Sequence, residues 1–265
     1  MRTIRSAYAT AIAILVTGLC ASTSSGAPDT GPSTQPVGHV TRVAIYHDKG
    51  SNDKGLTNVS KCLAVQGVDF SSTAITAEEI RAGALKNFDV LVQPGGSGSK
   101  QAEELQLEGR EKIQSFVKGG GGYIGICAGA YLATPSYSWS LGLINVDVVD
   151  RKHWARGMGP VQIGFLPEGK QLLGIDKNDS AVEYAQGPLL AKGDRTDLPP
   201  CQPLATFQTE MAKKGAPTGV MVGTIAIASG IYGNGRVMCI SPHPERSPGL
   251  DGLIRHAVAW ADSTK

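Results

Sequence analysis

The stretch Gly120-Gly-Gly-Tyr-Ile-Gly-Ile-Cys-Ala-Gly-Ala-Tyr-Leu-Ala133 decides how the rest of the chain is interpreted. Its apolar part, residues 122–126, predicts a buried strand, and the small and apolar residues that follow predict a buried helix. Cys127 stands between them, with a glycine two residues away on each side. Gly-x-Cys-x-Gly between a strand and a helix is the sulfur form of the nucleophile elbow. We therefore take Cys127 as a candidate nucleophile.

Segments of strand and helix type alternate on the amino-terminal side of this unit. Alternation of this kind predicts a parallel sheet that is covered by helices on both faces. Thr76 and Glu79 form a capping-box pattern, which marks the start of one helix. The expected strands are residues 41–46 and 88–92, and the expected helices are residues 54–66, 76–85 and 101–118.

Beyond Ser136 the pattern changes to short strands joined by polar turns with little helix. This pattern predicts an antiparallel extension of the parallel sheet. The expected strands are residues 143–149, 161–165, 181–186, 204–208 and 224–228, followed by a strand at 236–241. Leu250, Leu253, Ile254 and Ala257 lie near helical spacing, so a C-terminal helix that docks on the sheet is expected.

The first residues have the character of a secretory signal peptide. Arg2 and Arg5 precede an apolar run of about thirteen residues, which is short for a membrane span, and small residues follow. We expect a signal peptide at 1–27, a flexible linker at 28–40 and a single domain at 41–265. The protein would be exported to the periplasm or cell surface, with no membrane span after leader removal. An uncleaved anchor and lipidation at Cys20 remain alternatives.

The composition excludes few classes of protein. The chain has 265 residues, 41% of them apolar, and a formal charge of +2. This balance gives no reason to expect a nucleic-acid partner, because such sites need clustered Lys and Arg. No Cys or His spacing matches a zinc site, so we expect no metal and no cofactor. Disulfides among Cys62, Cys201 and Cys239 stay open, and Cys62 with Cys201 is one candidate pair.

Three predicted strand ends carry the residues that are candidates for taking part in a reaction. In an open parallel sheet, functional groups gather beyond the carboxyl ends of the strands. Here those ends are residues 93–97, 125–129 and 241–245. The Cys127 sulfur would stand at a helix N-terminus, which favours the thiolate. The N–H of Ala128 would stabilise an oxyanion, with a second donor from the backbone of Gly95 or Gly96.

The third strand end supplies the remaining members of a nucleophilic triad. His243 lies between two prolines that restrict its backbone. Glu245 follows two residues later, where its carboxylate would orient the imidazole. Two plainer interpretations stay open: Cys127 as a small buried residue in a tight turn, and the His-Pro-Glu segment as a solvated turn.

These segments together resemble the class I glutamine amidotransferase superfamily. The stretches 120–133 and 236–245 are most similar to the amidotransferase-like domain at the N-terminus of biotin protein ligases, and residues 154–157 and 183–188 also suit that branch. The resemblance covers roughly Val43 to the C-terminus. It implies a flavodoxin-like, doubly wound fold with Cys127 as nucleophile, His243 as base and Glu245 as its partner. We take Tyr131, Arg156 and Tyr184 as candidate residues of a substrate rim.

One departure from the pattern bears on the reaction. Members of the superfamily that use glutamine usually carry Gly-His-Gln after the nucleophile, whereas here Gly129 is followed by Ala130 and Tyr131. We therefore expect a cysteine hydrolase that acts on a small-molecule amide or acyl substrate, and neither glutamine amidotransfer nor biotin ligation. A catalytically silent binding or scaffold module and a redox-sensing cysteine protein are the alternatives. The substrate and the oligomeric state are left open.

Overall fold

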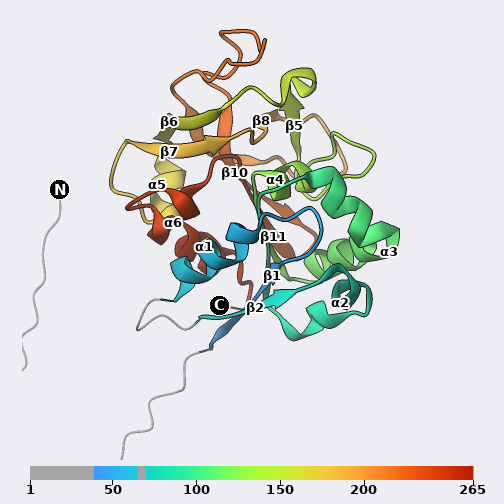
Figure 1. Ribbon diagram of the computed structural model, residues 1–265. Coiled ribbons are helices and arrows are strands. Elements are labelled where there is room, and N and C mark those ends of the chain that lie inside the picture. Colours follow the sequence, from blue (N-terminus) through green and yellow to red (C-terminus); the bar gives the residue numbers. More distant parts are fainter. Residues whose placement is uncertain (1–38, 65–69, 265) are drawn as a thin grey trace, which may run out of the picture. The chain divides into compact units, whose positions relative to one another are not determined.

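A sheet of eleven strands runs through the part of the chain that the computed structural model describes, residues 39–64 and 70–264 (Figure 1). The predicted signal peptide, Cys20 and most of the predicted linker lie outside these residues. The end of the helix predicted at 54–66 also lies outside them.

Five neighbouring strands form the parallel part of the sheet. Their order across the sheet is β2-β1-β3-β4-β11, and each is parallel to its neighbours. Their bounds are β1 Thr41–Tyr46, β2 Phe70–Ile75, β3 Val90–Gln93, β4 Gly122–Ile126 and β11 Gly235–Ile240. All five carboxyl ends therefore emerge at one edge of the sheet.

The remaining strands continue the sheet in antiparallel fashion from β11. The path runs through β10, β9, β6 and β7, while β8 pairs with β10 and with β5. Their bounds are β5 Val146–Val149, β6 Met158–Phe165, β7 Asp179–Ala185, β8 Leu189–Lys192, β9 Gln202–Phe207 and β10 Ile225–Tyr232. A parallel sheet with an antiparallel extension is thus confirmed.

Helices cover the parallel strands on both faces (Figure 1). Alternate residues of each strand point to opposite faces, and the buried side chains accordingly form two clusters. One cluster packs the sheet against α1 (Asp53–Leu63), α5 (Pro167–Leu173) and α6 (Asp251–Ala261). The other packs it against α2 (Ala77–Arg81), α3 (Gly98–Lys118) and α4 (Ala128–Ala133). Three 3-10 turns complete the elements: η1 Ala84–Asn87, η2 Arg151–His153 and η3 Pro244–Arg246.

The structure refines several details of the sequence analysis. The capping box predicted at Thr76 and Glu79 is present at the start of α2. Strands β2 and β8 and helix α5 were not predicted. Residues Ser71 to Ala74 of β2 are all exposed, so this edge strand lacks the apolar alternation that marks a strand in a sequence.

The cysteines of the described residues are all free thiols. Cys62 lies in the cluster beneath α1 and α6, whereas Cys201 lies in the cluster on the opposite face of the sheet. The candidate pairing of Cys62 with Cys201 was therefore wrong, because the sheet separates the two sulfurs.

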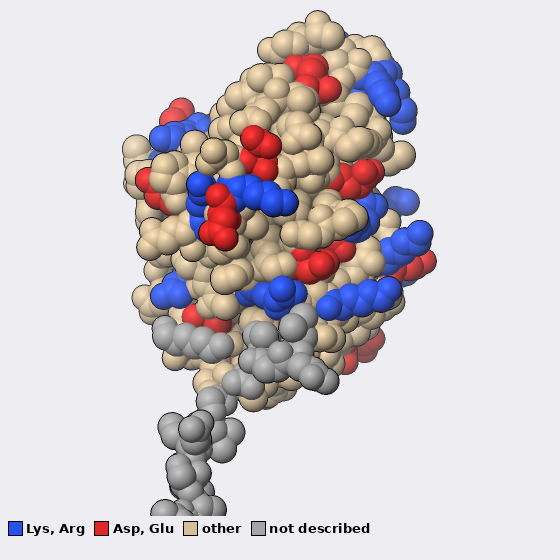
Figure 2. All heavy atoms as spheres, turned by 90° about the vertical axis from the view of Figure 1, so that its left-hand side faces the viewer, with Lys and Arg blue, Asp and Glu red and all other residues tan. Residues whose placement is uncertain are grey.

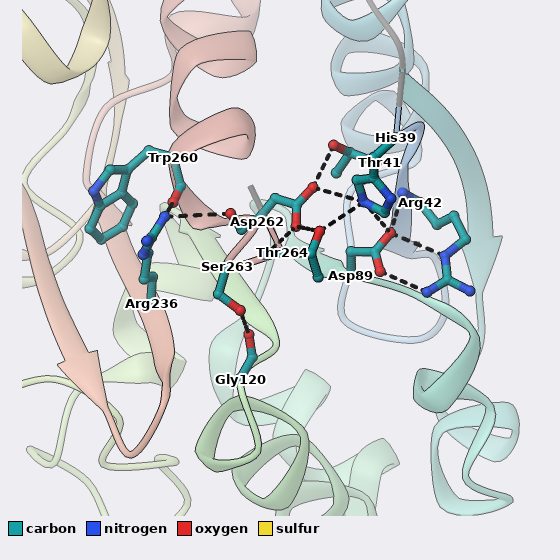
Figure 3. Close-up of polar contacts among 10 residues, drawn as sticks. All are labelled: His39, Thr41, Arg42, Asp89, Gly120, Arg236, Trp260, Asp262, Ser263 and Thr264. Carbon is teal, nitrogen blue, oxygen red and sulfur yellow. Dashed lines mark hydrogen bonds and ion pairs between the residues drawn. The ribbon is translucent and has the colours of Figure 1, made fainter. Parts of the chain in front are cut away.

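A polar cluster fastens the amino-terminal edge of the parallel strands to the C-terminal segment (Figure 3). The Thr41 hydroxyl donates to the buried Asp262 carboxylate (2.7 Å). The Arg42 side chain donates twice to Asp89, over 3.0 and 2.7 Å, and its backbone N–H donates to the same carboxylate over 2.8 Å. The His39 ring lies between the two carboxylates, with Nε2 3.2 Å from Asp262 and 3.6 Å from Asp89. The cluster thus ties the starts of β1 and β3 to the end of α6.

The surface carries charges of both signs. On the side that lies at the left of Figure 1, Lys and Arg are interspersed with Asp and Glu (Figure 2). Among the described residues of this face, Lys and Arg do not gather into a stripe of the kind that binds nucleic acid. Within the described ranges, no helix has both the length and the apolar character needed to span a membrane.

Replacing Asp262 with Asn should lower stability in a pH-dependent way. Burial raises the pKa of Asp262, but hydrogen bonds from Thr264 and Thr41 outweigh it and hold the pKa below its ordinary value. A carboxyl group whose pKa is lower in the folded than in the unfolded protein stabilises the fold at pH values above its unfolded pKa of about 4. This stabilisation is lost as the pH falls through the pKa of the folded state. Asp262→Asn should lower the free energy of unfolding, measured with urea, by about 2 kcal/mol at pH 7 and by less at pH 3. The control is the exposed Asp176, whose replacement with Asn should leave the free energy of unfolding unchanged at both pH values. If both variants lost the same stability, the proposed role of Asp262 would be contradicted.

Candidate functional site

Cys127 occupies a strained turn between β4 and α4. Its backbone has φ 51° and ψ −99°, which side-chain-bearing residues rarely adopt. The Cys127 N–H donates to the Ile240 carbonyl oxygen (2.8 Å), so the turn is held by the neighbouring strand β11. Strain of this kind costs about 1–3 kcal/mol and persists only where the surroundings impose it.

The two glycines around Cys127 are required by close backbone contacts. A Cβ atom at Gly125 would lie 2.4 Å from the Gly129 carbonyl oxygen, and one at Gly129 would lie 2.0 Å from the Gln93 carbonyl oxygen. Both distances are far below van der Waals contact. The buried Tyr123 hydroxyl also donates to the Gly129 carbonyl oxygen (2.9 Å). The spacing of the motif is therefore a packing requirement of this turn.

His243 and Glu245 lie together just beyond β11. The His243 N–H donates to the Glu183 carbonyl oxygen (2.7 Å), which fixes the backbone against β7. Nδ1 of the ring lies 2.7 Å from Oε1 of Glu245. Both side chains are buried, with exposed fractions of 7% and 4%. Because Nδ1 is bonded to the carboxylate, Nε2 is the ring nitrogen that remains for another partner.

That partner is Cys127. Burial lowers the pKa of His243, but the charge of Cys127, a hydrogen bond with its side chain, and the Glu245 carboxylate raise it to about 9. Gly95 lies against both groups: a Cβ built there would be 2.7 Å from Cε1 of His243 and 3.6 Å from Cβ of Cys127. The sulfur also donates to the Ala185 carbonyl oxygen (3.4 Å). The thiol is thus placed between a carbonyl and an imidazole.

The predicted oxyanion donors lie around the same point. Ala128 is the first residue of α4, so its N–H has no partner within that helix. Ala128 and Gly96 both line the cavity next to Cys127. Among the described residues, the N–H groups of Gly95 and Gly96 donate to no backbone carbonyl. Helix α4 has only six residues, so its dipole is small and the imidazole of His243 is the main polar partner of the sulfur.

A cavity of about 430 Å³ opens beside Cys127. Its walls come from the start of α3, the elbow, the loop after α4, the turn η2 and the end of β7. The lining residues are Gly96, Ser97, Gly98, Ser99, Cys127, Ala128, Tyr131, Tyr137, Trp139, Arg151, Trp154, Ala185 and Gln186.

Of the three candidate rim residues, only Tyr131 lines this cavity. Tyr184 is buried, donates from its hydroxyl to the Gly187 carbonyl oxygen (2.8 Å) and packs edge-on against Phe207. Arg156 is also buried, with Nη2 2.5 Å from Asp150 and Nη1 3.6 Å from Glu210. Both side chains are committed to internal contacts, so the structure does not place them on the rim.

Arg156 nevertheless acts on the cavity through the turn η2. Asp150 has φ 53° and accepts hydrogen bonds from both the N–H and the ring of His153. The ion pair with Arg156 holds this carboxylate in place, and the turn it caps presents Arg151 and Trp154 to the cavity. Arg156 is therefore a positioning residue.

Part of the cavity wall was not predicted from the sequence. Tyr137, Trp139, Arg151 and Gln186 were not singled out. Gln186 follows β7 with φ 63°, an unusual conformation for a residue with a side chain. Aromatic and basic residues at 137–139 and 151–154 are the only signal of this wall in the sequence.

One group of side chains has the proximity that a metal site needs. Ligand atoms of His39, Asp89 and Asp262 lie within 4.8 Å of one another, in the part of the chain that is described. Both carboxylates already accept hydrogen bonds from Arg42 or Thr41 (Figure 3). The group lies at the amino-terminal ends of β1 and β3, whereas Cys127 follows the carboxyl end of β4. These contacts favour a structural role.

Comparison with known proteins finds a family model that matches part of the chain. Residues 41–160 match the family model described as biotin-protein ligase, N terminal. The predicted resemblance is confirmed. The amidotransferase-like segment carries the elbow and η2, together with most of the cavity wall, and the strand ends that hold Gln186 and His243 follow it.

A sequence relative of this chain carries a name that states no activity. An uncharacterized protein from Chlamydia muridarum (strain MoPn / Nigg) is 28% identical over 164 residues, which are 60% of this chain and 58% of that protein. The chain thus spans less than two thirds of the length of this curated relative.

Solved structures with the same fold come from several organisms. A protein from Thermoplasma acidophilum, provisionally named as a GMP synthase subunit, has a TM-score of 0.56 at 14% identity, over 86% of this chain and 96% of that one. A provisionally named ThuA-like protein from Bacteroides uniformis has a TM-score of 0.54 at 14% identity, over 87% and 94%. These likenesses show the fold alone, which is amidotransferase-like.

Replacing Gly129 with Ala should disrupt the elbow. The new Cβ would collide with the backbone of Gln93, so we expect a loss of about 1–3 kcal/mol in the free energy of unfolding. Gly252→Ala is the matched control, because a Cβ there would meet only the end of Arg255 at 3.5 Å. In helix α6 that change should stabilise the protein by about 0.5–1 kcal/mol. Urea unfolding measures both, and a harmless Gly129→Ala would contradict the proposed packing.

Proposed function

We propose that the protein is a cysteine-nucleophile hydrolase that acts on small amide or acyl substrates, with Cys127, His243 and Glu245 as a catalytic triad. The observation that carries this proposal is that the strained turn of Cys127 faces the imidazole of His243. Nδ1 of that ring is hydrogen-bonded to the buried carboxylate of Glu245. A nucleophile, a base and a group that orients the base are the parts that such a reaction needs.

The first half of the reaction forms an acyl-enzyme. His243 takes the thiol proton on Nε2, and the Cys127 thiolate attacks the substrate carbonyl carbon to form a C–S bond. The carbonyl π electrons move to oxygen, and the resulting oxyanion accepts hydrogen bonds from the N–H groups of Ala128 and of Gly95 or Gly96. When the oxyanion collapses, the C–N bond breaks and the imidazolium donates its proton to the leaving amine.

The second half releases the acid. A water molecule loses a proton to His243 and attacks the thioester carbon, and the same backbone amides hold the second oxyanion. The C–S bond then breaks, and the sulfur leaves as thiolate or recovers a proton from the imidazolium. Glu245 keeps Nδ1 protonated throughout and stabilises the positive charge on the ring.

The residues after the elbow argue against glutamine as the substrate. Ala130 is buried and apolar, so it offers no side-chain polar group to a substrate. Tyr131 lines the cavity with an aromatic ring in place of the amide that glutamine-using members carry. The proposed reaction is therefore hydrolysis, with water as the acceptor of the acyl group.

Cys127 should be the most reactive thiol of the described domain. Burial and the nearby Asp251 raise the pKa of Cys62 to about 12, and burial raises the pKa of Cys201 and of Cys239. Those three groups stay protonated and unreactive at neutral pH. With chloroacetamide at pH 6 to 8, peptide mass spectrometry should find Cys127 labelled first.

A variant that lacks the proposed base, His243→Gln, is the control for the labelling experiment. His243→Gln should slow labelling of Cys127 by at least about tenfold at pH 6 to 7, because the variant lacks the imidazole that holds the proton beside the sulfur, and such acid–base assistance contributes about 10² to 10⁴ in rate. An anilide or thioester substrate should leave an acyl adduct on Cys127 in the wild type and none on Cys127→Ala. Labelling no faster than at Cys62, or unchanged by His243→Gln, would contradict the hydrolase and favour a silent binding module.

A further inference from the structure

We infer that the cavity beside Cys127 selects amides whose acyl or amine part is a flat aromatic group that carries a carboxylate. This inference rests on the proposed function, because it names the substrate class of the same site. Three independent features of the cavity support it: an aromatic wall, an uncompensated positive charge and a free side-chain amide.

The aromatic wall would hold a planar ring. Tyr137 and Trp139 are stacked, with ring centroids 4.6 Å apart and an interplanar angle of 13°. Tyr131 meets Tyr137 edge-on at 6.1 Å, and Trp154 lines the cavity with 54% of its surface exposed. An exposed tryptophan at the mouth of a cavity offers a flat apolar face on which a planar ligand ring can stack. A volume of about 430 Å³ also exceeds what a small aliphatic amide would fill.

The charge of the cavity is positive. Arg151 is the one Arg, Lys or His that lines it, and no Asp or Glu lines it. In residues 39–64 and 70–264, no carboxylate lies within ion-pair distance of Arg151. Its contacts are a hydrogen bond to the Ser136 carbonyl oxygen (2.7 Å) and a position over the Tyr137 ring. The guanidinium therefore keeps donors for a carboxylate.

A helix N-terminus adds to this positive field. Residues 96–99 line the cavity at the start of α3, whose first helical segment runs from Gly98 to Leu105 before a break at Gln106 (φ 57°). The Ser97 side chain makes no capping hydrogen bond, so the first amides of the helix lack a side-chain acceptor. Such amides favour a negative charge. Together with Arg151 they make a cationic ligand unfavourable.

Gln186 is placed to recognise the amide. It follows Ala185, whose carbonyl oxygen accepts from the Cys127 sulfur, so it lies beside the reacting group. Gln186 lines the cavity, and its side chain makes no hydrogen bond among the described residues. A side-chain amide presents both a donor and an acceptor, which match the C=O and N–H of a substrate amide.

The turn that carries Arg151 and Trp154 is fixed before a ligand arrives. The buried Arg156 pairs with Asp150, which caps η2 through His153. A site that is held in its binding conformation loses less entropy when a ligand binds. The neighbouring Lys152 on the same turn is exposed and does not line the cavity. It therefore offers a matched control for the charge of Arg151.

Binding can be measured without catalysis in Cys127→Ala. The probes are 4-acetamidobenzoate, which has the aromatic ring, the amide and the carboxylate, and acetanilide, which lacks only the carboxylate. Trp139 and Trp154, two of the three tryptophans of the chain, line the cavity, so quenching of tryptophan fluorescence reports binding. We expect 4-acetamidobenzoate to bind about tenfold more tightly than acetanilide, the value of one charge-assisted contact.

Three variants in the Cys127→Ala background resolve the contributions. Arg151→Gln should remove the tenfold preference for the carboxylate and leave acetanilide unchanged, and Arg151→Lys should restore part of the preference. Lys152→Gln should leave both affinities as they were. Trp139→Leu should weaken both probes by a similar factor of about ten, because stacking contributes to each; the remaining Trp154 still reports binding.

The outcomes separate this inference from the proposed hydrolase. Equal affinity for the two probes, or a preference that survives Arg151→Gln or is lost in Lys152→Gln, would overturn the inference whatever the reactivity of Cys127. The expected binding pattern with an unreactive Cys127 would support the inference and overturn hydrolysis alone.

Discussion

The candidate site depends on the contact of three backbone segments at the elbow. Gly129 packs against the Gln93 carbonyl of β3, and Gly125 packs against the Gly129 carbonyl, with no room for a Cβ atom at either position. This packing forces Cys127 into its strained conformation and turns its side chain out of the sheet edge. The strain is sustained because parallel strands on both sides of β4 hold the turn.

Strand register then brings the distant imidazole to the same place. In the parallel pair of β4 and β11, Ile126 lies opposite Ile240. Cys127 follows one residue after its strand and His243 three residues after the other, so both emerge at the carboxyl edge. The contact of β7 with His243 closes the third side and brings Ala185 and Gln186 to the sulfur. Residues far apart in the sequence thus meet through strand order alone.

The parts of this arrangement that follow local rules were predictable from the sequence. The glycine spacing around Cys127, the capping box of α2 and the strand ends at residues 93–97 and 241–245 each have a short-range cause. The edge strand β2 was not predictable, because its residues are exposed and lack alternation. The cavity wall was not predictable either, since Arg151 and Trp154 reach it only through an αL turn at Asp150.

The misplaced rim residue Arg156 shows the same limit. An arginine after a loop tryptophan is compatible with substrate binding, and only the buried ion pair with Asp150 reveals that it supports the wall from behind. Buried pairs of this kind depend on the tertiary structure, so the chain around Arg156 gave no sign of it. Its removal would leave His153 as the remaining partner of the Asp150 carboxylate and would take away the support of the turn η2 from behind.

The ionisation of His243 tests the central claim most directly, because the sulfur and the carboxylate act on the same ring. A pH titration of the ¹³Cε1 resonance can be assigned among the five histidines by comparison with His243→Gln. The structure predicts a midpoint near pH 9 for His243, which follows from a pKa raised to about 9. In Cys127→Ala the midpoint should fall. A midpoint near ~6.5 in both proteins, the value of an isolated imidazole, would contradict the pairing of Cys127 with His243.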